Sequence, residues 1–150
     1  MSRPEHHFDL GSIGSGLPVA RAEHELALAA KTGAMIVSAA PGTGKTTFVP
    51  ALIANFLGGA PQAGGGRVLL TEPRRVAVRA AARRIAGLDR PALGAAVCYT
   101  VRGERRVSAS TRIEVLTPGV LLRRLLSDPA LESIAAVILD EVHERSVDSD

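Results

Sequence analysis

The strongest indication of the fold is the stretch Ala39-Ala40-Pro41-Gly42-Thr43-Gly44-Lys45-Thr46-Thr47. An apolar run, Met35-Ile36-Val37, precedes it, and a segment with helical spacing of apolar residues begins at Lys45. A glycine-rich turn between a strand and a helix lets successive backbone N–H groups point at phosphate oxygens, and the helix N-terminus adds its positive dipole end. The stretch therefore predicts a phosphate-binding loop within a parallel α/β fold.

Each position of this loop suits a part of a bound nucleotide. Gly42 and Gly44 permit a left-handed backbone that other residues resist. Lys45 is expected to reach the β- and γ-phosphates and so to act in catalysis, and Thr46 to ligate Mg²⁺ through its hydroxyl. The residues expected to contact ATP form one continuous run: Ala40, Pro41, Gly42, Thr43, Gly44, Lys45, Thr46 and Thr47. A chance glycine-rich turn is the alternative, and the flanking strand and helix argue against it.

A second polar segment, Asp140-Glu141, follows the apolar run Val137-Ile138-Leu139. In a doubly wound sheet this places both acids at the carboxyl end of a parallel strand, where they face the ligand crevice. Asp140 is expected to hold Mg²⁺, and Glu141 to share in the metal site and to orient or deprotonate the attacking water. The expected metal residues are thus Thr46, Asp140 and Glu141. A solvated acidic turn is the alternative.

Apolar runs, turns and amphipathic segments alternate along the chain, a pattern typical of a parallel sheet flanked by helices. Strands are expected at residues 34–39, 67–71, 95–101, 112–117 and 135–140. Helices are expected at residues 20–31, 45–57, 75–87 and 119–127. Residues 1–16, rich in Gly, Ser and Pro, are expected to be a flexible lead-in, and residues 17–150 to form one domain. Because no further apolar strand follows Asp140, we interpret this domain as incomplete at its C-terminal side.

The composition fits a globular chain and leaves the partner open. Of the 150 residues, 46% are hydrophobic and 22% charged. The formal net charge is +3, and the excess is almost entirely arginine between Arg67 and Arg124. A polyanionic partner and solvated helix faces explain this bias equally well. Cys98 is the single cysteine, no apolar run approaches membrane-spanning length and the histidines lack zinc-ligand spacing, which together favour a cytoplasmic protein without zinc.

Five segments, in this order along the chain, carry a resemblance to a known family. They are Gly42-Thr43-Gly44-Lys45-Thr46-Thr47, Thr71-Glu72-Pro73-Arg74-Arg75-Val76-Ala77, Tyr99-Thr100-Val101-Arg102-Gly103-Glu104, Thr117-Pro118-Gly119-Val120-Leu121-Leu122 and Asp140-Glu141-Val142-His143-Glu144-Arg145-Ser146. Together they resemble the motifs of superfamily 2 DEAH-box helicases, most of all the bacterial HrpB type. The resemblance implies that residues 17–150 are an incomplete first RecA-like domain, which binds ATP.

The resemblance also implies roles that spacing alone does not give. His143 would couple hydrolysis to domain closure, and Arg84 would stack on adenine. Residues expected to touch the backbone of single-stranded RNA or DNA are Arg74, Arg75, Thr117 and Gly119. Such contacts position the polymer without reading its sequence. Pro118 stands where relatives commonly have an acidic residue, and Val142 where they commonly have Ala.

The family further implies a second RecA-like domain in cis, carrying arginine fingers that complete the ATP site. Because a finger contributes about 10³- to 10⁵-fold in rate, the chain alone is expected to hydrolyse ATP weakly and not to unwind a duplex. Two other classes remain open: a small P-loop kinase, and a non-catalytic nucleotide- or nucleic-acid-binding module. Arginine contacts to a backbone do not distinguish RNA from DNA.

Overall fold

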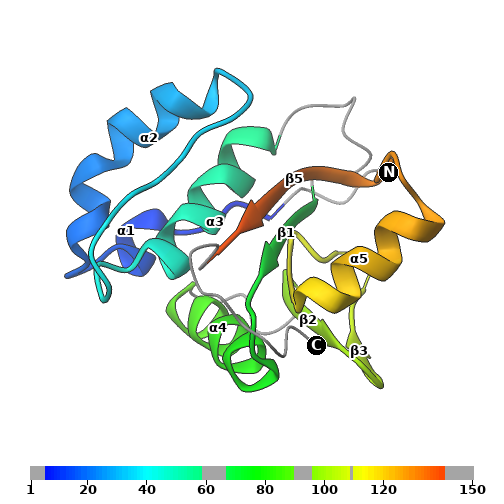
Figure 1. Ribbon diagram of the computed structural model, residues 1–150. Coiled ribbons are helices and arrows are strands. Elements are labelled where there is room, and N and C mark those ends of the chain that lie inside the picture. The colour runs from blue at the N-terminus through cyan, green and yellow to red at the C-terminus, as the bar shows by residue number, and fades with distance from the viewer. Residues whose placement is uncertain (1–5, 59–66, 90–95, 109, 141–150) are drawn as a thin grey trace.

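The computed structural model describes residues 6–58, 67–89, 96–108 and 110–140, and Figure 1 shows how their elements are arranged. The helices are α1 (Leu10–Ile13), α2 (Glu23–Ala30), α3 (Lys45–Leu57), α4 (Arg75–Leu88) and α5 (Pro118–Ser127), with a 3₁₀ helix at Pro18–Ala22. The strands are β1 (Arg67–Thr71), β2 (Val97–Val101), β3 (Glu104–Arg106), β4 (Ile113–Leu116) and β5 (Ile134–Leu139). None of the described helices is both long and apolar enough to cross a membrane.

The strands form one sheet in the order β3-β2-β4-β1-β5. β1 pairs in parallel with β4 and β5, β2 pairs in parallel with β4, and the short β3 returns antiparallel to β2. The carboxyl ends of β2, β4, β1 and β5 therefore lie along one edge of the sheet (Figure 1). The predicted fold class, a mostly parallel sheet flanked by helices, is confirmed.

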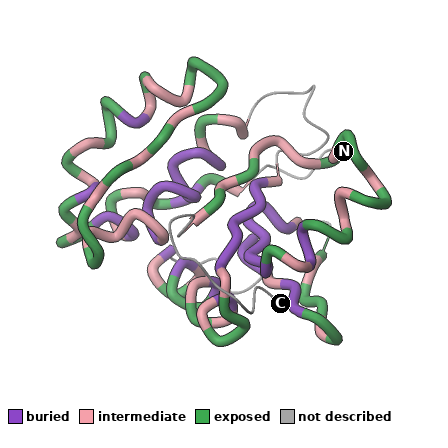
Figure 2. The backbone as a smooth tube through the Cα atoms, viewed as in Figure 1, coloured by how far each residue is buried: buried purple, intermediate pink, exposed green. Residues whose placement is uncertain are grey.

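Helices cover the sheet on two faces because alternate strand residues point in opposite directions. Val68 and Leu70 of β1 belong to the main core, which also includes apolar residues of α3 and α4. Leu69, between them, packs instead with Val120 and Leu121 of α5 in a second cluster. Figure 2 shows the central strands as the most continuously buried part of the backbone.

The strand predicted at residues 34–39 is absent from the sheet. These residues have no strand assignment, and Ile36 is 95% exposed, although Met35 and Val37 pack against the core. Residues 33–37 line a cavity of about 600 Å³ opposite residues 135–140, so the segment passes β5 at a distance instead of pairing with it. An apolar run becomes a strand only where a neighbour completes its backbone hydrogen bonds, and the described chain supplies none here. The prediction was wrong for this segment.

The expected flexible lead-in is structured from residue 6 onward. Phe8 is 1% exposed and Ile13 fully buried, and both belong to the main core. The side chain of Asn55 in α3 brackets Phe8: its Oδ1 accepts from Phe8 N at 2.7 Å and its Nδ2 donates to Phe8 O at 2.9 Å. Two apolar side chains thus anchor a segment whose composition suggested mobility, while residues 1–5 lie outside the described part.

Candidate nucleotide site and nucleic-acid interface

The phosphate loop has the backbone that its glycines predict. Gly42 and Gly44 adopt left-handed φ angles of 81° and 90°, and Gly44 caps the N-terminus of α3. A Cβ at Gly44 would lie 2.6 Å from Leu17 Cδ1 and would strain the backbone as well. The loop is also tied to the preceding segment, because Val19 N donates to Thr43 O at 3.1 Å.

Lys45 and Thr46 begin α3 and are partly exposed. Lys45 Nζ donates to Ala39 O at 3.1 Å, which holds the ammonium group over the start of the loop. Thr47, in contrast, is 6% exposed, so its side chain lies in the protein interior beneath the loop. A direct contact between Thr47 and a nucleotide stays a prediction.

Asp140 brings the second motif to the loop. It follows β5, and its Oδ2 accepts a hydrogen bond of 2.5 Å from Thr46 Oγ1, across 94 residues of sequence. The hydroxyl and the carboxylate that the sequence assigned to one metal therefore lie side by side. Oxygen ligands of this kind suit Mg²⁺, which binds through one or two protein oxygens and keeps several waters. The residues present fit the expected ion.

The cavity beside the loop has a polar end and an apolar body. Lys45, Thr46 and Asp140 line the polar end. The apolar lining comes from the segment before the loop, from α3 and from β5, and includes Met35, Val49, Ile53, Phe56 and Ile138. Arg84, expected to stack on adenine, lies exposed on α4 and is not among the residues that line this cavity.

The predicted nucleic-acid residues lie at the same edge of the sheet as the loop. Arg74 occupies the position before α4, three residues after β1, without a side-chain cap bond, whereas Thr117, directly after β4, caps α5 with its side chain. The two strand ends are joined, since Glu72 N donates to Leu116 O at 2.9 Å. Arg74 and Arg75 are exposed, and the guanidinium of Arg75 donates to Arg102 O at 2.8 Å.

Thr117 differs from these arginines in its surroundings. It is 3% exposed, and its Oγ1 accepts from Val120 N at 3.4 Å, so the side chain serves as the N-cap of α5. Gly119, two residues later, is half-buried in the first helical turn. The Thr117 oxygen thus has a structural role at this turn, and a contact of Thr117 or Gly119 with a phosphate stays a prediction.

Glu104 links the β2–β3 hairpin to α4, a connection that sequence reasoning missed. Its carboxylate accepts from Arg79 Nη2 at 2.7 Å, from Tyr99 Oη at 2.7 Å and from Arg106 Nε at 3.4 Å. The bonds from Arg79 and then Tyr99 lower the pKa of Glu104 from an ordinary value of 4.5 to about 2. The hairpin turn is thereby fixed beside Arg75. The sequence signal was the Val-Arg-Gly-Glu element, to which no residue role had been given.

Two predicted catalytic residues, Glu141 and His143, lie outside the described residues. Their roles, and the share of Glu141 in the metal site, stay predictions. Within the described part, Lys45, Thr46 and Asp140 lie together at the polar end of the cavity. Arg74, Arg75 and Gly119 lie where α4 and α5 begin, at the carboxyl ends of the strands.

Comparisons with known proteins identify relatives over most of the chain. Residues 21–149 match the family model described as DEAD/DEAH box helicase. The chain is 40% identical over 137 residues to the ATP-dependent RNA helicase HrpB of Escherichia coli (strain K12), which covers 91% of this chain and 16% of HrpB. It is 42% identical over 136 residues to the ATP-dependent RNA helicase DHX33 of Drosophila melanogaster, which covers 89% of this chain and 19% of DHX33.

A solved structure agrees with these matches. The crystal structure of the Escherichia coli DEAH/RHA helicase HrpB superposes with a TM-score of 0.75 at 41% identity, covering 90% of this chain and 17% of that one. The chain thus spans less than a fifth of the length of each of these relatives.

Proposed function

This chain belongs to the DEAD/DEAH box helicase family, and we propose that it is the ATP-binding part of a motor that couples ATP hydrolysis to movement along single-stranded RNA. Two relatives named as ATP-dependent RNA helicases support this choice of nucleotide and polymer. Because the chain spans only a small part of those relatives, the activity belongs to the intact protein. A second RecA-like domain in cis would close the cleft over the nucleotide.

The observation that carries the proposal is the meeting of Thr46 and Asp140 beside the left-handed glycines of the loop. A hydroxyl and a carboxylate 2.5 Å apart, next to a lysine ammonium and a helix N-terminus, combine metal ligands with phosphate donors. A merely structural turn would not require both left-handed glycines and a carboxylate aimed at the Thr46 hydroxyl. This set of groups suits a metal-bound nucleoside triphosphate.

Each residue of the nucleotide site would have its own role in ATP hydrolysis. Bound Mg²⁺ would offset negative charge on the phosphate oxygens. Thr46 and Asp140 would hold it, with Glu141 nearby, and Lys45 would exchange its bond to Ala39 O for the outer phosphates. Glu141 would orient the attacking water and accept its proton. His143 would connect this site to the facing domain.

The polymer would lie across the carboxyl edge of the sheet. Exposed Arg74 and Arg75 would contact phosphates with their side chains, and the first turn of α5 at Gly119 would contact them through the backbone. The arginines lie at the start of α4, which follows β1, and Gly119 at the start of α5, which follows β4. Because β1 and β4 are paired, the distance between the two sets of contacts is fixed. Contacts of this kind hold any sequence, which a translocating motor requires.

ATP turnover by the intact protein, with and without single-stranded RNA, tests the proposal. We expect RNA to stimulate turnover, and Lys45→Ala or Glu141→Gln to reduce it by about 10²- to 10³-fold. Lys31→Ala is the matched control, because it removes the same charge from an exposed position at the end of α2. Transfer of phosphate to a small molecule instead of water would favour the kinase class. If Lys45→Ala bound ATP as tightly as the wild type, the proposed nucleotide site would be refuted.

A further inference from the structure

Glu114 is a fully buried carboxylate in the middle of β4, outside every motif described above. It lies on the sheet face that α5 covers, since its neighbours Ile113 and Val115 point into the main core on the other face. A charge in such a place costs free energy unless partners surround it.

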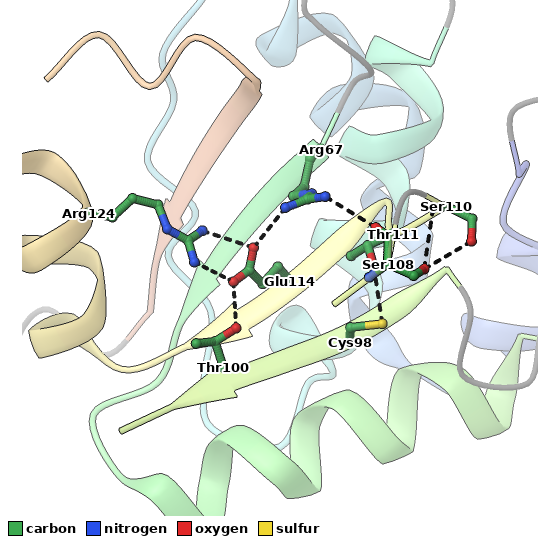
Figure 3. A network of polar contacts seen from close by, with 8 residues as sticks. All are labelled: Arg67, Cys98, Thr100, Ser108, Ser110, Thr111, Glu114 and Arg124. Carbon is green, nitrogen blue, oxygen red and sulfur yellow. Dashed lines mark hydrogen bonds and ion pairs between the residues drawn. The ribbon is translucent and has the colours of Figure 1, made fainter. Parts of the chain in front are cut away.

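The partners of Glu114 come from three elements (Figure 3). Arg124 of α5 forms a bidentate pair with it, with Nη1 2.9 Å from Oε1 and Nη2 2.7 Å from Oε2. Thr100 of β2 donates to Oε2 at 2.7 Å, and Arg67 at the start of β1 donates to Oε1 at 3.3 Å. Each carboxylate oxygen of Glu114 therefore accepts two hydrogen bonds.

The network keeps Glu114 ionised. Burial by itself raises the pKa of this carboxyl, but the hydrogen bonds from Arg124 and Thr100 and the charges of Arg124 and Arg67 outweigh burial and lower it. The same pairing raises the pKa of Arg124. The pair is thus a charged clamp between β4 and α5.

Along the sequence, Glu114 and Arg124 flank the turn at residues 117–119, which the proposed function places against RNA. Glu114 precedes Thr117 by three residues, and Arg124 follows it by seven, which is close to two helical turns and so returns to the same face of α5. The apolar contacts of α5 come from buried Val120 and Leu121, which pack with Leu69 and Leu116, and from partly buried Leu125. Apolar contacts are not directional, whereas a bidentate fork fixes the rotation of a helix.

We propose that Glu114 is a positioning residue for RNA binding, which acts through Arg124 to fix the rotation of α5 and thereby the direction in which the Gly119 turn presents its backbone. In α5, Pro118 has no N–H and Val120 N donates to Thr117 Oγ1, so the Gly119 N–H is the donor whose direction determines whether this turn meets a phosphate. The inference rests on the proposed function, because it assumes that this turn contacts RNA.

Arg124→Lys in the intact protein tests the inference most cleanly. Lysine keeps the charge but cannot form the two-pronged bond. We expect its affinity for a single-stranded uridine homopolymer to fall about five- to tenfold, with affinity for a fluorescent ADP analogue and the urea unfolding midpoint nearly unchanged. Arg123→Lys is the matched control, because Arg123 is the exposed neighbour on α5 and undergoes the same chemical change.

A second pair of variants separates positioning from stability. Arg124→Gln alone leaves Glu114 buried without its main partner, and it should weaken both folding and RNA binding. Adding Glu114→Gln restores a neutral amide pair, and we expect RNA affinity to return to within a fewfold of the wild type. The inference would be overturned if the affinities for RNA and ADP fell in parallel with the unfolding midpoint. It would also be overturned if Arg124→Lys left the affinity for RNA unchanged. A wild-type protein that does not bind the homopolymer would instead refute the proposed function.

Discussion

At the scale of single residues, the proposed nucleotide site depends on atoms that the chain supplies from positions 94 residues apart. Thr46 and Asp140 were each predicted from local sequence, one after a glycine-rich turn and one after an apolar run. Asp140 reaches this place at the end of the parallel strand β5, whereas Thr46 is placed by α3, which packs on the sheet although the segment before the loop is not one of its strands. Glu114 could also have been noticed in advance, because a lone acid within Ile113-Glu114-Val115-Leu116 requires partners. Which partners it finds depends on long-range packing that no local pattern contains.

Gly44→Ala tests the backbone of the loop. With φ at 90° and Leu17 Cδ1 2.6 Å from the new Cβ, alanine should destabilise the fold by about 1–2 kcal/mol and abolish tight ATP binding. Gly87→Ala is the control, since Gly87 lies in α4 with open space around the new Cβ and should gain stability slightly. Urea denaturation and nucleotide titration measure the two effects. Equal behaviour of the two variants would contradict the account.

Asp140→Asn tests the metal role separately from the hydrogen bond to Thr46. Asparagine can still accept from the Thr46 hydroxyl, but it lacks the charge that a divalent cation requires. We expect ATP affinity to lose most of its Mg²⁺ dependence, while affinity measured in EDTA stays the same. Asp128→Asn, at the end of α5, should leave the Mg²⁺ dependence intact. An unchanged Mg²⁺ effect in Asp140→Asn would remove Asp140 from the metal site.

Glu104→Gln gives a prediction about pH. Because the folded pKa of Glu104 is about 2, below its ordinary value of 4.5, its ionised form adds stability above pH 4.5. That contribution declines as pH falls toward 2. Wild type should therefore be more stable than Glu104→Gln at pH 7, with the difference shrinking between pH 4.5 and 2 in urea denaturation. Glu132→Gln, an exposed change of the same kind, serves as control, and a difference independent of pH would contradict the assignment.

At the scale of elements, sequence periodicity predicted helices 45–57 and 75–87 almost to their ends. It failed where the structure depends on a neighbour. Residues 34–39 are apolar enough for a strand but lie unpaired in the described chain, and β3 is a strand of three polar residues because β2 pairs with it. Periodicity reports which face of a segment is apolar, not whether another backbone lies beside it.

The N-terminal segment offers a test at this scale. Phe8→Ala should destabilise the protein by about 3 kcal/mol or more, because Phe8 is a buried part of the core. Phe56→Ala removes the same side chain from a position that is 41% exposed and should cost clearly less. Urea denaturation of both variants measures the difference. Equal and small losses in the free energy of unfolding would instead support the flexible lead-in that the composition predicted.

At the scale of the whole molecule, the carboxyl edge of one sheet collects the phosphate loop, Asp140 and the helix starts at Arg74 and Thr117. The fold class and the family were both predictable, since they depend on motif order and on alternating apolar segments. The arginine bias was ambiguous in the sequence. Arg74 and Arg75 lie exposed at this edge, while Arg67 and Arg124 are half-buried and bonded to Glu114. Composition alone could not divide the arginines in this way.

We propose that the nucleotide site and the exposed Arg74 and Arg75 belong to one RNA-dependent motor. This coupling is measured by the ratio of ATP turnover with saturating single-stranded RNA to turnover without it, in the intact protein. We predict a ratio well above one that falls toward one in the double variant Arg74→Ala/Arg75→Ala, with ADP affinity unchanged, and that persists in Arg83→Ala on the same helix. A wild-type ratio of one, or a ratio that the double variant leaves intact, would contradict the account.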